Sequence, residues 1–152
     1  ALIVNKIPVI GLVGVPKKNR LFYSYGINNS YLIENKKKFK NDCSKKNEKG
    51  NIVALSSDSN PSADILKKLK FYKVNSIVKM ASSYKFCVIA NGEFDIYAAN
   101  ERANQWDYAA GHAIAEHAGA IVKTLDGKRF IYGNETYKNE SIIIMRSKNL
   151  ND

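Results

Sequence analysis

The residues that could carry chemistry are concentrated in the segment 106–119, WDYAAGHAIAEHAG. Asp107 stands where the first turn of a helix would begin, in the N-cap position, and its carboxylate could accept hydrogen bonds from the free backbone N–H groups there. Ala109, Ala110 and Gly111 leave that turn nearly bare of side chains, so it can approach a ligand or another backbone closely. The sequence leaves two interpretations of Asp107 open, a helix cap and a carboxylate that binds a ligand.

Two histidines in the same segment were considered as metal ligands. His112 and His117 are five residues apart. On a helix their directions differ by about 140°, so they cannot both face one ion. His112 and Glu116 share a helix face, but such a spacing is more common as a side-chain pair on an exposed helix face than as a metal site. We therefore assign no metal site to these histidines.

The elements that must position this segment follow two patterns. Residues 1–35 predict antiparallel structure, because short runs rich in Val, Ile and Tyr alternate with turn residues. From residue 51 strands and helices alternate, which is typical of an α/β layer with helices packed on a sheet. The predicted strands are 1–4, 7–15, 20–26, 30–34, 52–55, 76–80, 95–97, 120–124, 128–132 and 141–146, and the predicted helices are 62–71, 83–91 and 107–118.

A lysine-rich segment, 36–50, separates the two patterns. Its seven lysines against Asp42 and Glu48 supply +5 of the formal net charge of +10. Such a run of like charge is typical of an exposed linker. We therefore predict one region of antiparallel strands and linker, 1–50, and a C-terminal α/β domain, 51–152.

Composition excludes several classes of protein. With 152 residues, of which 45% are hydrophobic and 25% charged, the chain can build an ordinary globular core. The longest apolar stretch, 7–16, is ten residues long, about half of a bilayer span. Cys43 and Cys87 could form one disulfide at most; we expect both to be reduced and Cys87 to be buried. We expect a cytoplasmic protein that is not associated with a membrane.

The basic charge could indicate a nucleic-acid partner, but its composition argues against one. Lysine outnumbers arginine by twenty to four, whereas proteins that read phosphate backbones favour the bidentate guanidinium of arginine. We therefore expect no nucleic-acid partner. A basic surface does favour small anionic ligands.

Several motifs, taken in order and spacing, resemble the inositol monophosphatase superfamily. The segment 106–119 is similar to a signature of that superfamily in which a Trp-Asp pair opens a helix and small residues follow. Residues 1–11 are similar to the strand pair that follows the superfamily's first metal motif. Four further motifs resemble the bacterial 3′(2′),5′-bisphosphate nucleotidase branch of that superfamily. They are ASSYKFC at 81–87, Ala90-x-Gly92, Asp95-Ile96-Tyr97 and Asn104-x-Trp106-Asp107.

This resemblance implies a fold, an activity and a site. The fold would be the layered αβαβα arrangement of the sugar phosphatases, here with a truncated antiparallel first sheet and a complete C-terminal mixed sheet flanked by helices. The activity would be magnesium-dependent hydrolysis of the 3′-phosphate of 3′-phosphoadenosine 5′-phosphate. Asp107 would be a metal ligand, and Ser82, Ser83 and Lys85 match positions near the substrate. An alternative interpretation of these last three residues is a helix cap and a surface lysine. No catalytic residue is assigned.

The departures from the family pattern are equally informative. The chain contains no Asp-Pro and no Asp-Gly-Thr, which belong to the family's main metal motif. One carboxylate cannot hold a cluster of Mg²⁺ ions. Ala98 and Ala99 occupy the stretch where the family has an arginine, and SDSN at 57–60 replaces a Ser-Arg-Ser-His-like segment. Loss of a cation and gain of Asp58 are expected to weaken anion binding.

We therefore expect the C-terminal portion of a bisphosphate nucleotidase-like phosphatase, inactive or nearly so by itself, with Mg²⁺ a cofactor of the complete enzyme and not retained by this chain. Two alternatives stay open: a non-enzymatic module that binds anions or nucleotides, and inositol monophosphatase activity in the full-length parent. The expected partners are a small phosphate substrate and either a missing upstream half or a second copy, because residues 1–35 would expose strand edges and an apolar face.

Overall fold

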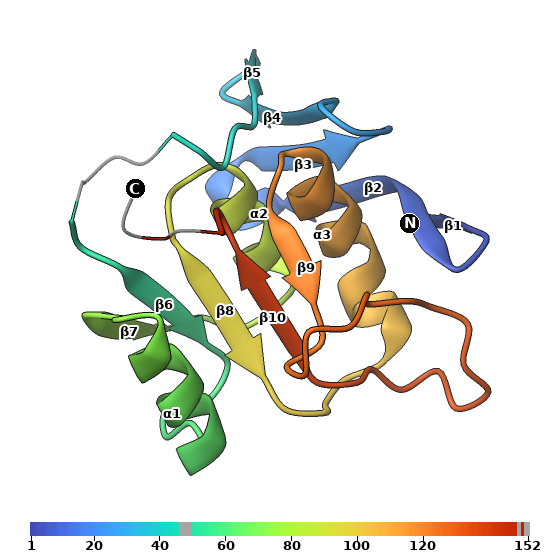
Figure 1. Cartoon of the computed structure of the whole chain (residues 1–152). Helices are drawn as coiled ribbons and strands as arrows, with labels where there is room; N and C mark the ends of the chain where they lie inside the picture. Colours follow the sequence, from blue (N-terminus) through green and yellow to red (C-terminus); the bar gives the residue numbers. More distant parts are fainter. Residues whose placement is uncertain (46–49, 149, 151–152) are drawn as a thin grey trace.

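In a computed structural model of the chain, the structure describes residues 1–45, 50–148 and 150. The described residues form two five-stranded sheets with two helices between them (Figure 1). The first sheet is antiparallel in chain order: β1 (Leu2–Val4), β2 (Ile7–Val15), β3 (Arg20–Ser24), β4 (Ser30–Glu34) and β5 (Lys37–Lys40), with a 3₁₀ turn at Pro16–Lys18.

The second sheet is mixed and has the strand order β7-β6-β8-β10-β9. β6 pairs in parallel with β7 and β8, whereas β10 is antiparallel to β8 and β9. Its strands are β6 (Val53–Ser56), β7 (Ser76–Lys79), β8 (Ile96–Ala99), β9 (Ile121–Lys123) and β10 (Ile142–Met145), and the helices are α1 (Ala63–Phe71), α2 (Tyr84–Ala90) and α3 (Gln105–His117). The predicted layered α/β architecture, with an antiparallel sheet and a mixed sheet, is confirmed.

The helices α2 and α3 lie between the two sheets, and α1 covers the other face of the second sheet (Figure 1). One hydrophobic core includes Phe22 and Leu32 from the first sheet together with Phe86 and Tyr97 from the rest of the chain. Both cysteines are buried free thiols, as expected. No helix in the described ranges is long and apolar enough to cross a membrane.

The predicted linker is wrong over its first part, where Lys37–Lys40 forms β5. The preceding residues Asn35 and Lys36 have φ angles of 50° and 64°, the left-handed pair that closes a two-residue hairpin and fixes its register. Lysines have a poor strand propensity, but they are well suited to an edge strand, where they oppose pairing with other chains. Asn41 and Cys43 are buried rather than exposed, and residues 46–49 of the predicted linker lie outside the described residues.

A second correction concerns the predicted strand 128–132. The structure has an isolated bridge there between Lys123 and Arg129 instead of a strand. Tyr132 donates its backbone N–H to the carbonyl of Lys6, in the turn between β1 and β2. The side chains of Phe130 and Tyr132 are nevertheless buried. The segment thus fills the core between the layers, and this burial produced the strand-like alternation in the sequence.

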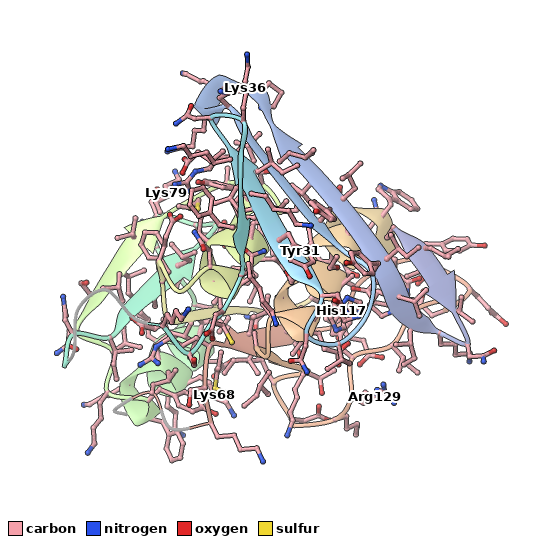
Figure 2. All side chains as sticks on the ribbon, turned by 90° about the horizontal axis from the view of Figure 1, so that it is seen from above. Tyr31, Lys36, Lys68, Lys79, His117 and Arg129 are labelled. Carbon is pink, nitrogen blue, oxygen red and sulfur yellow. The ribbon has the colours of Figure 1, made fainter. Side chains whose placement is uncertain are left out.

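The basic side chains are spread around the molecule. Figure 2 shows Lys36, Lys68, Lys79 and Arg129 at widely separated places on the periphery. These four basic residues therefore do not gather on one face.

The small residues Ala110 and Gly111 in the second turn of α3 allow two close contacts. A Cβ atom added to Gly11 in β2 would collide with the carbonyl oxygen of Ala110. A Cβ added to Gly111 would lie 2.8 Å from Cβ of Phe86 in α2. These residues therefore bring the helix directly against β2 and α2. The expectation that they form a bare first turn is wrong, because the helix starts at Gln105 and its first turn carries large side chains.

Substitution of Gly11 tests this contact. We expect Gly11→Ala to lower the free energy of unfolding by about 1–3 kcal/mol, because the helix must move away from the strand. Gly14→Ala is the matched control in the same strand, where an added Cβ meets nothing within 4 Å, and its effect should stay within about 1 kcal/mol. Urea denaturation followed by circular dichroism measures both. Equal effects for the two variants would contradict the close approach of α3 to β2.

Candidate functional site

The second sheet has a switch point between β6 and β8. From β6 the chain passes through α1 to β7 on one side, and then through α2 to β8 on the other. The two helices cover opposite faces, since Ile65 and Ala98 belong to one hydrophobic core and Phe86 and Tyr97 to the other. In open α/β sheets, ligands bind in the crevice at the carboxyl ends of the strands at such a point.

A pocket of about 370 Å³ lies at this end of the sheet, on the side of α2 and α3. We call it the serine–lysine pocket. The four residues that the sequence analysis singled out, Ser82, Ser83, Lys85 and Asp107, all line it. The structure therefore brings together residues from the N-terminal ends of two different helices.

Lys85 is a buried cation, with 4% of the residue exposed. Its ammonium donates a hydrogen bond of 2.8 Å to the carbonyl of Ser82 and lies 4.9 Å from the centre of the Tyr97 ring. Within the described residues it has no carboxylate partner. Desolvation, together with the charge of Arg102, lowers the pKa of Lys85 to about 8. The interpretation of Lys85 as a surface lysine is therefore wrong, because α2 is buried along its whole length.

Ser82 and Ser83 line the same pocket as this ammonium. Ser82 has a left-handed φ of 71°, which is uncommon for a residue with a Cβ atom and is concentrated at functional positions. Ser83 is the N-cap residue of α2, as the helix-cap alternative has it, but its side chain makes no capping hydrogen bond. In the part of the chain that the structure describes, neither hydroxyl has a hydrogen-bond partner. Both are therefore open to a ligand.

The sequence analysis predicted Asp107 as the N-cap of the helix. This is wrong, because Asp107 is the third residue of α3. The helix begins earlier, after the N-cap residue Asn104, and the Asp107 carboxylate accepts the backbone N–H of Asn104 at 2.9 Å through Oδ2. The side chain is exposed at the edge of the serine–lysine pocket. Asp107 thus stabilises the helix start with one oxygen and presents the other to the pocket.

Comparison with known proteins decides the family. Residues 1–151 match the inositol monophosphatase family. The chain belongs to the inositol monophosphatase family. It is 30% identical over 138 residues to the 3′(2′),5′-bisphosphate nucleotidase CysQ of Escherichia coli K12, and this match covers 87% of the chain and 52% of CysQ. It is 33% identical over 132 residues to CysQ of Buchnera aphidicola subsp. Acyrthosiphon pisum, covering 87% of the chain and 49% of that relative.

The fold agrees with this family assignment. The crystal structure of CysQ from Bacteroides thetaiotaomicron superposes with a TM-score of 0.81 at 24% identity, over 95% of this chain and 60% of that one. The inositol monophosphatase of Staphylococcus aureus bound to 2′-AMP superposes with a TM-score of 0.74 at 14% identity, over 98% of this chain and 55% of that one. The chain spans about half the length of the curated CysQ relatives that it matches.

Arg102 is a pocket residue of this family member that sequence reasoning missed. It lines the serine–lysine pocket, and its guanidinium donates to the Asp58 carboxylate at 2.7 Å. The expectation that the pocket has lost its cation is therefore wrong, since a guanidinium enters it from the loop after β8. The absence of the family arginine at Ala98 and Ala99 was the signal that could have directed attention to the nearest arginine along the chain.

Hydroxyl groups line the wall between the sheet and α3. The Tyr97 hydroxyl lies 3.2 Å from the Ser57 hydroxyl and 3.3 Å from the Tyr108 hydroxyl. Burial raises the pKa of Tyr108 far above its usual range, so this hydroxyl stays protonated. The sequence analysis quoted motifs that contain these three residues but assigned none of them to the site. Tyrosines in a strand and a helix resemble ordinary core residues, and Ser57 was noted only as part of a departure from the family pattern.

The described residues of the pocket provide one carboxylate that could bind a metal ion, which is too few for a metal cluster. Among the residues that the structure describes, no group of three or more His, Cys, Asp or Glu side chains is placed to hold a metal ion. Asp107 is the sole acidic side chain among the described residues that line the pocket. Mg²⁺ is usually held by one or two carboxylates together with substrate phosphate. A complete magnesium site of the family's type is therefore not formed by these residues alone.

The two histidines of α3 form hydrogen bonds within the fold. His112 is 1% exposed and its Nδ1 lies 2.9 Å from the Tyr132 hydroxyl. Burial lowers its pKa to about 3, so it is neutral. Nδ1 of His117 accepts the backbone N–H of Gly26. His112 and Glu116 do share a helix face, with Nε2 and Oε2 3.6 Å apart, but His112 is buried rather than exposed because α3 packs between the two sheets.

The burial of Lys85 predicts a gain in stability when its charge is removed. At pH 7 we expect Lys85→Met to raise the free energy of unfolding by about 1–2 kcal/mol, because an apolar side chain carries no desolvation cost. Lys79→Met is the matched control, since Lys79 is exposed and donates to the Ser59 hydroxyl, and it should change little. Thermal and urea unfolding measure both variants.

The stability gained in Lys85→Met should depend on pH. The folded pKa of about 8 lies below the ordinary value of 10.5, so the folded protein releases this proton before the unfolded chain does. The cost of the charge is fully present below pH 8 and disappears as the pH rises toward 10.5. The advantage of Lys85→Met should therefore shrink over that range. An advantage that does not depend on pH would contradict the account.

Proposed function

We propose that this chain supplies the nucleotide-binding part of a phosphatase that removes the 3′-phosphate of 3′-phosphoadenosine 5′-phosphate. The observation that carries the proposal is the buried ammonium of Lys85, which lines a pocket with the hydroxyls of Ser82 and Ser83. Within the described residues the ammonium has no carboxylate partner and the two hydroxyls have no hydrogen-bond partner. An anionic ligand would supply the missing counter-charge. The CysQ relatives, which are bisphosphate nucleotidases, support the choice of a phosphorylated nucleoside.

The residues of the chain divide the work of binding. Lys85 and the hydroxyls of Ser82 and Ser83 would hold phosphate oxygens, because an ammonium and hydroxyl groups are donors to such oxygens. The free oxygen of Asp107 would face a metal ion that other parts of the complete enzyme help to hold. Members of the family are generally magnesium-dependent phosphatases. Because the described residues offer one metal ligand, we propose that the chain alone binds the nucleotide and does not hydrolyse it.

A second candidate function follows from the same mismatch. The binding groups of the serine–lysine pocket are present, whereas a metal cluster is not. A chain with these binding groups and without the metal cluster would bind phosphorylated nucleosides and have no enzymatic activity. The two candidates share the ligand and differ in turnover when the rest of the family fold is supplied.

Calorimetric titration with 3′-phosphoadenosine 5′-phosphate, with and without Mg²⁺, tests the proposal. We expect saturable binding by the wild-type chain, a loss of at least about tenfold in affinity in Lys85→Met, and no release of phosphate by ³¹P NMR. Lys79→Met should bind as the wild type does. Absence of saturable heat would contradict the proposed function, and phosphate release at an ordinary enzymatic rate would contradict the inactivity of the isolated chain.

The same titration repeated over pH identifies Lys85 as the cation. Its ammonium is charged below a pKa of about 8 and neutral above it. The association constant should therefore be nearly flat from pH 6.5 to 7.5 and fall about tenfold by pH 9. Affinity that persists at pH 9 would show that another group holds the phosphate.

We also propose that the outer face of the first sheet is covered by the portion of the family fold that this chain does not include. Leu2 pairs with Ile10, and Leu12 pairs with Tyr23, so these side chains form cross-strand neighbours on the face directed away from α3. Leu2, Ile10 and Leu12 are 49%, 45% and 60% exposed. An apolar face of this kind marks a contact surface. The half-length match to the relatives supports the missing portion of the fold as its occupant.

Without that cover, the chain should self-associate. We expect sedimentation velocity to show concentration-dependent association, and Leu12→Glu to reduce it because a charge enters the apolar face. Ile27→Glu is the matched control, since Ile27 is 63% exposed in a turn outside the sheet. A sharp monomer at every concentration, unchanged by Leu12→Glu, would contradict the proposal.

A further inference from the structure

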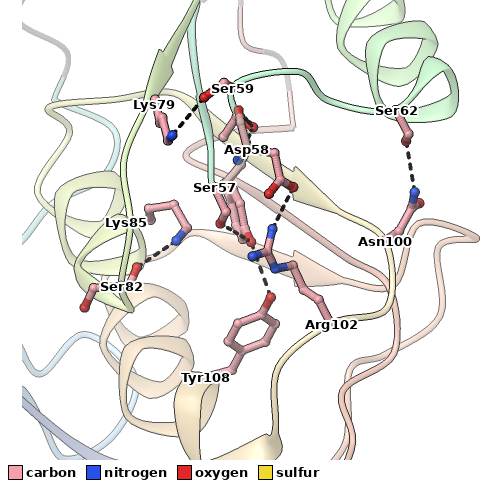
Figure 3. Close-up of polar contacts among 12 residues, drawn as sticks. Ser57, Asp58, Ser59, Ser62, Lys79, Ser82, Lys85, Asn100, Arg102 and Tyr108 are labelled. Atoms are coloured by element: carbon pink, nitrogen blue, oxygen red, sulfur yellow. Dashed lines mark hydrogen bonds and ion pairs between the residues drawn. The ribbon is translucent and has the colours of Figure 1, made fainter.

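A second pocket, of about 460 Å³, lies across the switch point from the serine–lysine pocket. We call it the acidic pocket, because Asp58 and Glu101 line it together with the start of α1 at Ser62. The two pockets share Arg102 in their walls. Figure 3 shows Arg102 reaching toward Asp58, with Lys85 and Tyr108 on its other sides. Arg102 thus lies on the boundary between a cationic pocket and an acidic one.

The ion pair of Arg102 with Asp58 is placed where it can open. The bond is 2.7 Å long, and the two side chains are 38% and 61% exposed. Exposed pairs of this kind contribute little to stability, so release of Asp58 costs the fold little. The backbone of Asp58 is held independently, since its N–H donates to the Ser56 hydroxyl and its carbonyl accepts from the same group. The carboxylate can therefore move while the loop stays in place.

The pair also acts on Lys85. The charge of Arg102 lowers the pKa of Lys85 and the charge of Asp58 raises it, so all three charges share one electrostatic environment. Lys85 is 4% exposed and lines the serine–lysine pocket, where its ammonium donates to the Ser82 carbonyl. Within the described residues, the pocket therefore holds one cation without an ion-pair partner and a second, Arg102, that is paired with Asp58.

We propose that Arg102 is the second anion-binding group of the serine–lysine pocket and that the ligand carries two separated anionic groups. Asp58 is then an internal competitor, which holds Arg102 until the second anionic group of the ligand displaces it. This inference rests on the proposed function and makes it more specific. A ligand with one phosphate engages Lys85 and leaves the Arg102–Asp58 pair closed. A ligand with two phosphates gains Arg102 but must release Asp58.

The competition predicts a selective effect of Asp58. Removal of its charge should favour ligands with two phosphates and leave ligands with one phosphate nearly unchanged. A general electrostatic effect would instead favour both. Glu101→Gln separates these cases, because it removes the same charge from the acidic pocket, whereas among the described residues the guanidinium of Arg102 forms its ion pair with Asp58 and not with Glu101.

The experiment is a calorimetric comparison of adenosine 3′,5′-bisphosphate with adenosine 5′-monophosphate. We expect Asp58→Asn to tighten bisphosphate binding about three- to fivefold and to change monophosphate binding less than about twofold. Arg102→Gln should reduce the preference for the bisphosphate to within about twofold of unity, and Arg102→Lys should restore part of it. In the Arg102→Gln background Asp58→Asn should have no further effect. Circular dichroism confirms that each variant is folded.

The outcomes distinguish this inference from the function on which it rests. If Asp58→Asn and Glu101→Gln strengthen both ligands equally, the competitor role is overturned. If both ligands bind in a Lys85-dependent way but the Arg102 variants keep the bisphosphate preference, this inference fails and the proposed function stands. If neither ligand binds the wild-type chain, both fail.

Discussion

The ammonium group of Lys85 is buried, and no carboxylate of the described residues forms an ion pair with it. It donates to the carbonyl of Ser82 and lies over the face of the Tyr97 ring. A buried charge without compensation costs stability. The organisation of the site follows from this constraint. The hydroxyls of Ser82 and Ser83 line the same pocket, an exposed carboxylate lies at the pocket edge, and a guanidinium pairs with a neighbouring acid.

The two central helices bring these groups to one place. Gly11 lets α3 lie directly on β2, and Gly111 lets it lie against Phe86 of α2. These contacts hold α3 beside α2, and Asp107 and Lys85 line the same pocket although they are far apart in the sequence. The carboxyl ends of β6 and β8 supply the floor. The small residues of the Trp-Asp motif therefore serve the packing of the layers, and through that packing the geometry of the site.

Much of this arrangement was predictable from the sequence. The change from antiparallel strands to alternating strands and helices was correctly predicted. The resemblance to the family, and not the spacing itself, implied roles for Ser82, Ser83, Lys85 and Asp107, which line one pocket. The helix start at Asn104 was missed, because Asp107 is itself a favourable residue at a helix start. β5 was missed because lysines seldom indicate a strand, although the turn at Asn35 and Lys36 sets its register.

The remaining errors depend on tertiary structure. The exposed face predicted for His112 is wrong because periodicity cannot show that a helix is covered by sheets on two sides. Lys85 is buried for the same reason, in a helix whose residues are all buried. Arg102 lies in a loop, and the direction of a loop side chain has no periodic signal. The division of the chain at residue 50 stays a prediction, while Phe22 and Tyr97 share one hydrophobic core across it.

The state of the Lys85 ammonium tests the central claim most directly. Heteronuclear NMR of the lysine side chains, with the Lys85 signal assigned by its absence in Lys85→Met, reports its titration in the free protein and with saturating inorganic pyrophosphate. The account predicts titration near pH 8 in the free protein and a clear upward shift with pyrophosphate, as the anion stabilises the charged form. Titration at the ordinary value of 10.5, unchanged by pyrophosphate, would contradict it.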